Sequence, residues 1–361
     1  MAPITSLFSF ALLTSILVAG SPVGFNRPTA DDINSTNNTN IINPSQPVYP
    51  RKSARDAPFS VTERALRHAI YIPPDFEYGS GSKNPVIMIP GTAVPAGTTY
   101  ANGFGRLLGD TDYADPVWVN IPGNSLGDVQ VNSEYIAYAI NYIAGVSRGK
   151  KVGLVSWSQG GINAQWAFKF WPSTINVVTD HIALAPDFKG SVLAPLICSP
   201  LTMSFCTPAI KQQDSTSNLI AALRSNGGDS AFVPTTTFYS SSDEIVQPQT
   251  GVNASAYLLD ARNVGVTNNQ VQVVCENPNA IVLHEGAIYN ALAWGLIQDA
   301  LTHDGPGQPS RLDTTTLCNE DAAPGMDALA SEAAIGSSAV GNILAAPGTT
   351  LEEVPIASYA S

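Results

Sequence analysis

Ser158 lies in a short run whose residue types suit a nucleophilic serine, because residues 156–160 read Ser-Trp-Ser-Gln-Gly. An apolar stretch at residues 152–155 leads into this run, and an amphipathic stretch at residues 162–171 follows it. A strand, a sharp turn and a helix in that order lift a serine hydroxyl above the edge of an α/β sheet for nucleophilic attack. Ser156 stands where the G-x-S-x-G pattern has its first glycine.

A histidine is needed as the base, because a serine hydroxyl attacks well only when its proton is removed. The usual chain order in this arrangement is serine, acid, histidine. His68 precedes the serine, and His181 leaves almost no room for an acid between the two, so neither fits. We favour His284, which follows the apolar run 281–283, over His303, which lies in a polar run. The alternative interpretation of His284 is a packed core histidine.

The acid that orients the histidine should lie between Ser158 and His284. Asp243 is favoured because it follows the last long strand-like run before the histidine, and its neighbour Glu244 should point elsewhere. A turn aspartate that caps the next segment is the alternative interpretation of Asp243. The other acidic residues considered in this interval are Asp187, Asp214, Asp229 and Asp260.

Two or more hydrogen-bond donors should face the oxyanion that forms when the serine attacks. One is expected to be the backbone N–H of Gln159, the residue after the nucleophile. The second is expected from Thr92, which follows Pro-Gly after an early strand-like run and could add its hydroxyl. A plain Gly-Thr turn is the alternative interpretation of Thr92.

Strand-like and helix-like segments alternate from residue 59 onward, which predicts an α/β fold with a mostly parallel sheet and helices on both faces. A helix is predicted from Asn132 or Ser133 to about residue 146. In parallel sheets, ligands bind beyond the carboxyl ends of the strands. Five candidates each follow a strand-like run and should meet at that edge: Thr92, Ser158, Asp187, Asp243 and His284.

The charge balance excludes some partners. The 361 residues carry a net charge of −12 with only 17 Lys and Arg, whereas nucleic acids require clustered cations. Strong binding to anionic membranes is excluded for the same reason. No C-x-x-C or H-E-x-x-H spacing occurs, so no zinc site is expected.

The first 55 residues differ in composition from the rest of the chain. Residues 1–20 are predicted to be a signal peptide, because an apolar run ends in small residues and is too short to span a bilayer. Residues 21–55 are rich in Asn, Ser, Thr and Pro, which predicts a disordered leader or propeptide. Residues 56–361 are predicted to form one domain. Basic residues near position 52 are either processing sites or solvated charges.

Secretion agrees with two further features, and no transmembrane segment is expected. Asn34, Asn37 and Asn253 begin glycosylation sequons. Four cysteines fit an oxidising, extracellular location, and the sequence alone leaves their three possible pairings open.

Several motifs together resemble the Candida antarctica lipase B-like fungal lipases, from about residue 56 to about residue 346. The most specific are the Trp-Ser-Gln-Gly-Gly and Asp-Glu-Ile-Val-Gln-Pro-Gln runs. The motifs lie at residues 90–92, 130–135, 156–161, 164–166, 185–190 and 242–249, together with the surroundings of His284.

This resemblance implies an α/β-hydrolase fold and lipase or carboxylesterase activity without a metal or organic cofactor. It also implies that Ser158 is the nucleophile, Asp243 the acid and His284 the base. Thr92 and Gln159 match the oxyanion donors of the family.

The resemblance extends to the substrate pocket. Trp157 matches a tryptophan that floors the pocket, and Asp187 and Glu244 match a buried carboxyl pair, one of which should hold a proton. Cys275 and Cys318 match a family disulfide, which leaves Cys198 and Cys206 as the second pair. Residues 192–206 take the place of a mobile helix over the site, so they form either an apolar lid or a packed surface loop. The Ala-rich helix expected at 325–346 could form the opposite wall.

We therefore predict a secreted, monomeric serine hydrolase that cleaves carboxylic esters such as acylglycerols through an acyl-enzyme on Ser158. Transient contact with a lipid interface is expected, and protonation of His284 should suppress the rate below about pH 6. A transacylase or a narrow short-chain esterase would use the same residues. A catalytically inactive lipid- or surface-binding protein is the alternative from another class.

Overall fold

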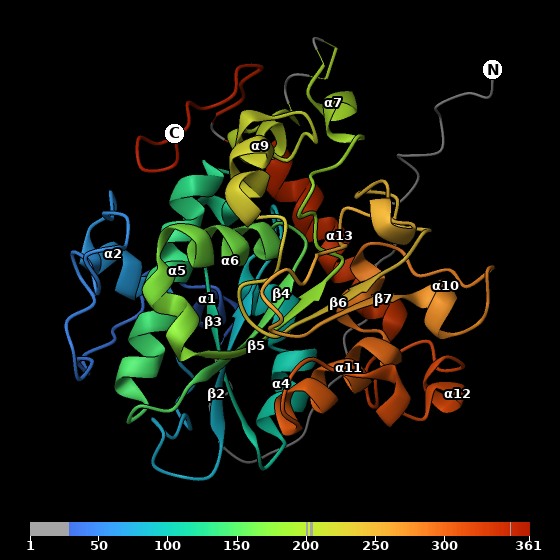
Figure 1. The fold of residues 1–361 in the computed structure, drawn as a ribbon, viewed down its shortest axis with the longest axis horizontal. Helices are drawn as coiled ribbons and strands as arrows, with labels where there is room; N and C mark the ends of the chain where they lie inside the picture. Colours follow the sequence, from blue (N-terminus) through green and yellow to red (C-terminus); the bar gives the residue numbers. More distant parts are fainter. Residues whose placement is uncertain (1–28, 200, 203–204, 347) are drawn as a thin grey trace.

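The computed structural model describes residues 29–199, 201–202, 205–346 and 348–361, so the predicted signal peptide at 1–20 lies outside the described residues. One seven-stranded sheet forms the centre of the molecule, in the order β1-β3-β2-β4-β5-β6-β7. Only β1 pairs antiparallel, which confirms a mostly parallel sheet (Figure 1). The strands are β1 Ile70–Tyr71, β2 Asn84–Ile89, β3 Ala114–Val119, β4 Val152–Trp157, β5 Val178–Leu184, β6 Thr235–Tyr239 and β7 Val266–Gln270.

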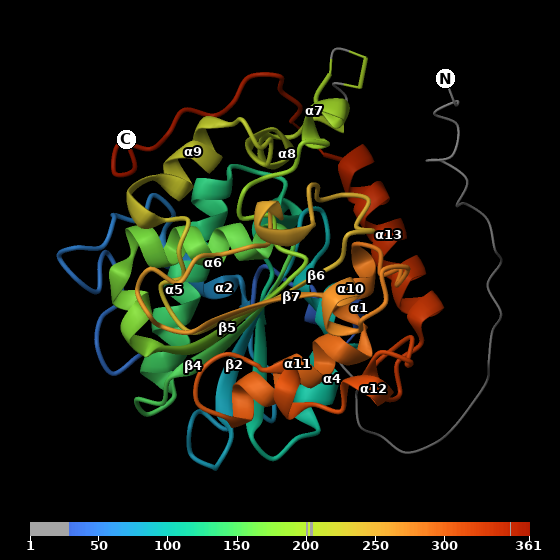
Figure 2. The same ribbon diagram turned by 45° about the vertical axis from the view of Figure 1, so that its right-hand side comes forward.

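Helices cover both faces of the sheet (Figures 1 and 2). The longest are α5 Val129–Val146, α6 Gln159–Phe170, α11 Ala291–Thr302 and α13 Ala328–Leu344. The shorter ones are α1 Ala30–Ile33, α2 Glu63–His68, α3 Ala96–Tyr100, α4 Phe104–Gly109, α7 Ala194–Ile197, α8 Pro208–Gln212, α9 Asn218–Arg224, α10 Val271–Val274 and α12 Thr314–Leu317. Among the helices described, none is both long and apolar enough to cross a membrane.

Alternate side chains of each central strand pack into two separate cores, because successive side chains of a strand point to opposite faces of the sheet. In β2, Ile87 and Ile89 pack in the cluster built on α5 and α6, whereas Val86 and Met88 pack in the cluster built on α4 and α11. The sheet is therefore buried on both faces, and functional side chains are left to its edge.

The helix α5 begins earlier than the sequence indicated. Asp128 is its N-cap and accepts a hydrogen bond from the N–H of Gln130, so the predicted caps were wrong. Asn132 and Ser133 lie inside the helix instead, where the amide of Asn132 donates to Ser125 O and to Gln159 Oε1. These polar side chains serve neighbouring segments, which is why they resembled a helix start.

The approach to His284 also differs from the prediction. Residues 281–283 form no strand, and Ile281 is 76% exposed, so His284 begins a short 3₁₀ helix at Glu285–Ile288 after a loop. The last strand of the sheet is β7, whose sequence Val-Thr-Asn-Asn-Gln lacks an apolar run because it lies at the edge of the sheet.

The described part of the predicted disordered leader is packed against the domain, so that part of the prediction was wrong. We call residues 29–45 the N-terminal strap. Asn40 donates hydrogen bonds to Arg67 O and Ile70 O, and Ile42 O accepts one from the hydroxyl of Tyr142 on α5. The polar residues that suggested disorder include asparagines whose side chains donate hydrogen bonds to backbone carbonyls of the domain. That residues 21–55 are a leader or propeptide stays a prediction.

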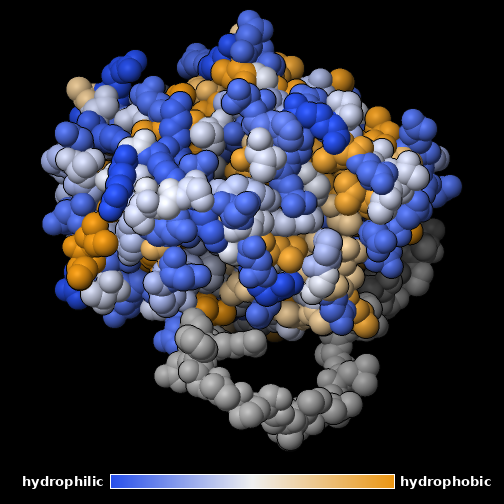
Figure 3. All heavy atoms as spheres, turned by 90° about the horizontal axis from the view of Figure 1, so that it is seen from below, coloured by the Kyte–Doolittle hydropathy of each residue, from blue (hydrophilic) through white to orange (hydrophobic). Residues whose placement is uncertain are grey.

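Polar side chains dominate the face seen from below the view of Figure 1, and apolar side chains gather there in smaller groups (Figure 3). Such a surface keeps a weakly charged protein in solution.

Candidate active site

Ser158 occupies a strained turn between β4 and α6. Its backbone has φ 55° and ψ −129°, a conformation that residues with a side chain rarely adopt. In this turn the start of α6 packs closely against the end of β2. Glycine at position 160 permits this contact, because a Cβ there would lie 2.8 Å from Ile89 O and from Pro90 O. The strain directs the serine side chain to the carboxyl edge of the sheet.

A hydrogen bond explains why Ser156 replaces the first glycine of the pattern. Its hydroxyl lies 2.8 Å from His181 Nε2, and both side chains are fully buried. Burial lowers the pKa of His181 to about 3, so the imidazole is neutral and can share this bond. His181 therefore has a structural contact behind the site.

The structure brings together the three residues predicted to form a catalytic triad. Ser158 Oγ lies 2.9 Å from His284 Nε2, and His284 Nδ1 lies 2.8 Å from Asp243 Oδ2. Asp243 Oδ1 accepts hydrogen bonds from the N–H groups of Ile245 and Val246 at 2.9 and 2.7 Å. The carboxylate is thereby fixed in place, and it in turn holds the imidazole with Nε2 directed at the serine.

The electrostatics of this arrangement favour the charged form of the histidine. Burial lowers the pKa of His284, but the carboxylate of Asp243 outweighs burial and raises the pKa above its ordinary value of 6.5. Glu244 holds the histidine from its backbone side, because Glu244 Oε2 accepts the His284 N–H at 3.0 Å. An imidazolium formed during a reaction would be stabilised by these carboxylates.

The two predicted oxyanion donors, Thr92 and Gln159, contact each other through their side chains. Gln159 is the first residue of α6, so its N–H has no partner within the helix. Thr92 Oγ1 accepts a hydrogen bond from Gln159 Nε2 at 3.0 Å and also contacts the amide of Gln213. The hydroxyl is thus held by two glutamines that come from distant parts of the chain.

Trp157 and Asp187 are also buried near the triad. The Trp157 ring lies 5.2 Å from the His284 ring between centroids, and its Nε1–H donates to His284 O. Burial raises the pKa of Asp187 to about 7, and its Oδ1 has no hydrogen-bond partner. A carboxyl group in this setting can hold a proton near neutral pH.

The predicted carboxyl pair of Asp187 and Glu244 was wrong. Asp187 is 1% exposed whereas Glu244 lies at the surface, and no hydrogen bond joins them among the described residues. Burial, followed by the negative charge of Glu285, raises the pKa of Glu244 to about 7. Residues 281–284 approach as a loop, and Glu244 accepts a hydrogen bond from the backbone N–H of His284 at the end of that loop.

His303, the alternative base, lies elsewhere. It follows α11, is 53% exposed and pairs with Asp299 at 3.2 Å. Within the described residues, no group of three or more His, Cys, Asp or Glu side chains is arranged to hold a metal ion.

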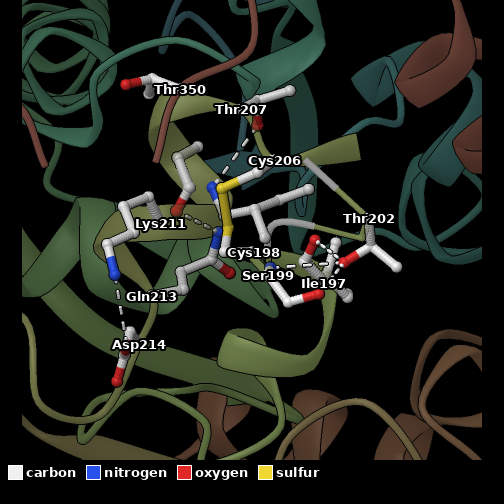
Figure 4. Close-up of a disulfide and its surroundings, with 12 residues drawn as sticks. Ile197, Cys198, Ser199, Thr202, Cys206, Thr207, Lys211, Gln213, Asp214 and Thr350 are labelled. Carbon is white, nitrogen blue, oxygen red and sulfur yellow. Dashed lines mark hydrogen bonds and ion pairs between the residues drawn. A yellow bond between two sulfur atoms is a disulfide. The ribbon is translucent and has the colours of Figure 1, made fainter. Parts of the chain in front are cut away.

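Both disulfides expected from the resemblance are present, Cys275–Cys318 and Cys198–Cys206. The second joins Cys198, which follows α7, to Cys206, which directly precedes Thr207, the N-cap of α8 (Figure 4). Gln213, the C-cap residue of α8, is the residue that contacts Thr92. The stapled segment and the oxyanion side of the site are therefore connected through one short helix.

The three sequons differ in accessibility. Asn37 and Asn253 are exposed, whereas Asn34 is only partly exposed and both atoms of its amide bond to Thr98. Glycosylation at all three stays a prediction.

Gln213 and Tyr100 contribute to the site although neither lies in a recognisable sequence motif. Gln213 contacts Thr92, and Tyr100 donates to the last carbonyl of β2. Both act through contacts with segments far away in the chain or through burial, and no local motif marks such contacts.

No family model matches the chain. The crystal structure of Aspergillus fumigatus lipase B superimposes with a TM-score of 0.87 at 51% identity, covering 91% of this chain and 79% of that one. The fold is thus that of the α/β-hydrolases, as predicted.

Lipase B of Candida (Pseudozyma) antarctica is 36% identical over 225 residues. That alignment covers 62% of this chain and 63% of the relative, so the chain matches less than two thirds of its length. The chain belongs to the lipase B family, which confirms the resemblance seen in its motifs.

Proposed function

We propose that the chain is a serine hydrolase that cleaves carboxylic esters through an acyl-enzyme on Ser158. The observation that carries the proposal is the hydrogen-bonded series from Ser158 Oγ through the His284 imidazole to Asp243, at 2.9 and 2.8 Å, built on a strained strand-to-helix turn. This geometry supplies a nucleophile, a base and an orienting acid.

In the first half of the reaction, Ser158 Oγ attacks the acyl carbon while His284 Nε2 takes the hydroxyl proton. The negative charge moves to the carbonyl oxygen, where the Gln159 N–H and the Thr92 donors stabilise it. When the intermediate collapses, the bond to the alcohol breaks and His284 gives the proton to the leaving alcohol. Water then repeats these steps on the acyl-enzyme, releasing the acid and restoring Ser158.

The surface around the site supports esters with an apolar acyl chain as substrates. We call the apolar rim the set of exposed apolar side chains on segments that adjoin the site: Val192, Leu196, Leu201, Ile245, Ile281, Leu329, Val340 and Leu344. Exposed apolar side chains that cluster near a site can form an interaction surface. Transient contact of this rim with a lipid interface, with residues 192–206 acting as a lid, belongs to the proposal.

Secretion is also part of the proposal. The apolar run at residues 1–20 and the two disulfides support an extracellular location. The monomeric state stays a prediction.

The direct test is Ser158→Ala, with Ser80→Ala at an exposed loop serine as the matched control. We expect Ser158→Ala to lower kcat for a p-nitrophenyl ester by at least roughly 10³-fold and to abolish labelling by a fluorophosphonate, while Ser80→Ala keeps both. Residual turnover above a few per cent would reject Ser158 as the nucleophile. Absence of labelling in the wild-type protein would favour the inactive binding protein.

A further inference from the structure

The N-terminal strap meets the domain at α3, the helix that follows Thr92 and its loop. Asn34 Oδ1 accepts the Thr98 N–H at 2.8 Å, and Asn34 Nδ2 donates to Thr98 Oγ1 at 3.1 Å. Asn120, beyond the end of β3, accepts the Gly97 N–H at 3.2 Å and donates to Ile33 O at 2.8 Å. Two asparagine side chains therefore fasten the strap to the first turn of α3.

These bonds satisfy backbone groups that the helix itself leaves without partners. The first N–H groups of any helix lack acceptors within it, and Pro95, the N-cap of α3, offers no side-chain acceptor. The strap approaches so closely that a Cβ on Gly97 would lie 2.3 Å from Ile33 O. Only glycine permits this approach without a backbone shift.

The helix α3 in turn holds both ends of the loop 90–95, which contains Thr92. At the start of the loop, the hydroxyl of the fully buried Tyr100 donates to Ile89 O at 2.7 Å. At its end, Pro95 O accepts the N–H and the hydroxyl of Thr99, both at 3.0 Å. A displacement of α3 would therefore move the loop at both of its anchors.

We propose that Asn34 is a positioning residue for the oxyanion donor Thr92, acting through α3, so that the N-terminal strap belongs to the working enzyme. The proposal rests on the function proposed above. Asn34 touches neither substrate nor the reacting atoms; its side chain fixes the helix that fixes the loop. Because the oxyanion exists only in the reaction intermediate, a misplaced Thr92 should lower kcat more than it raises KM.

Three substitutions separate this role from glycosylation. Asn34→Ala, Asn34→Asp and Thr36→Ala each destroy the same sequon, but only Asn34→Ala removes the acceptor of the Thr98 N–H. Asp keeps that acceptor, and the Thr98 hydroxyl can donate to its second oxygen. Thr36 is exposed, which makes Thr36→Ala the matched control.

We expect Asn34→Ala to lower kcat for a soluble p-nitrophenyl ester roughly three- to tenfold, less than the roughly 10²- to 10³-fold loss expected when an oxyanion donor is removed outright. Rates are taken per active site titrated with a fluorophosphonate. KM should stay within about twofold, and affinity for a trifluoromethyl ketone, which forms the tetrahedral adduct, should fall by the same factor as kcat. Asn34→Asp and Thr36→Ala should keep wild-type values.

Equal losses in all three variants, or an unchanged kcat in Asn34→Ala, would overturn the proposal. A lowered melting temperature with unchanged kcat per titrated site would show a purely structural role and overturn it too. If Asn34→Ala does not fold, amide exchange in the wild-type protein decides, because the Gly97 and Thr98 amides should be protected and free exchange would contradict their capping. Failure of the function itself would appear separately, as activity retained in Ser158→Ala.

Discussion

The catalytic floor and the apolar rim of this molecule are held in opposite ways. We use catalytic floor for Ser158, Gln159, Asp243 and His284, which are all buried and joined by hydrogen bonds of 2.7–3.0 Å to each other or to neighbouring groups. The rim side chains are exposed, and Leu201 reaches 97% exposure. The two regions therefore differ in burial and in polarity.

The difference indicates that the two regions have separate roles. Charge develops at the floor, where fixed donors and a fixed carboxylate stabilise a transition state without having to reorganise. Under the proposed function, the rim would meet an apolar substrate of variable shape, for which exposed area matters more than exact placement. Substitutions in the floor should therefore change the rate of chemistry, and substitutions in the rim should change access to particular substrates.

The largest effect is expected from Asp243→Asn in the floor. The amide would favour the wrong tautomer of His284, so kcat should fall roughly 10³- to 10⁴-fold. Asp260→Asn is the control, because Asp260 lies in the same interval of the chain but bonds to the N–H groups of Val264 and Gly265. Comparable losses in both variants would contradict the assignment of the acid.

The next effect is the pH dependence of kcat/KM. His284 must be neutral to accept the serine proton, and the Asp243 carboxylate raises its pKa above 6.5, so activity should be lost as the pH falls through that raised value. The rate should drop about tenfold per pH unit below the midpoint. The structure thus moves the expected midpoint above the pH 6 inferred from the sequence. A midpoint at or below 6 would show that burial outweighs the carboxylate.

A smaller effect is expected in the rim. Leu196→Ser and Leu329→Ser remove exposed apolar area on α7 and α13, so activity on an emulsified long-chain ester should fall roughly three- to tenfold. Activity on a soluble butyrate ester should stay within about twofold. Ile41→Ser, at a similarly exposed residue of the N-terminal strap, should change neither rate. Equal losses on both substrates would erase the distinction between rim and floor.

The smallest effect on catalysis should come from Ser156→Gly, behind the floor. This change restores the glycine of the usual pattern but leaves buried His181 Nε2 without its partner, at a cost of about 1–3 kcal/mol in the free energy of unfolding. Urea denaturation measures that cost, and kcat per titrated site should stay within about twofold. An unchanged unfolding free energy would show that the buried bond contributes nothing.

Local patterns made much of the site predictable. The strand, turn and helix around Ser158 lie within about twenty residues, and the chain order of serine, acid and histidine restricted the other two residues to a few candidates. The parallel sheet followed from the alternation of apolar runs. Each of these features is encoded by neighbouring residues, so the sequence displays it directly.

Features that depend on distant contacts were not predictable. Gln213 reaches Thr92 across 121 positions of the chain, and the N-terminal strap gains its order from carbonyl groups of segments it meets only after folding. The predicted pairing of Glu244 with Asp187 failed because Glu244 bonds to the backbone of His284, at the end of a loop. The apolar residues 281–283 in that loop suggested a strand, but they form none.

The buried hydrogen bond between Ser156 and His181 should restrict how these two positions change during evolution. Two residues on adjacent strands that satisfy each other cannot be replaced one at a time without leaving a polar group stranded. We expect positions 156 and 181 to covary among relatives, with glycine at the first accompanied by an apolar residue at the second. A double substitution, Ser156→Gly with His181→Phe, should then be less harmful than the sum of its parts.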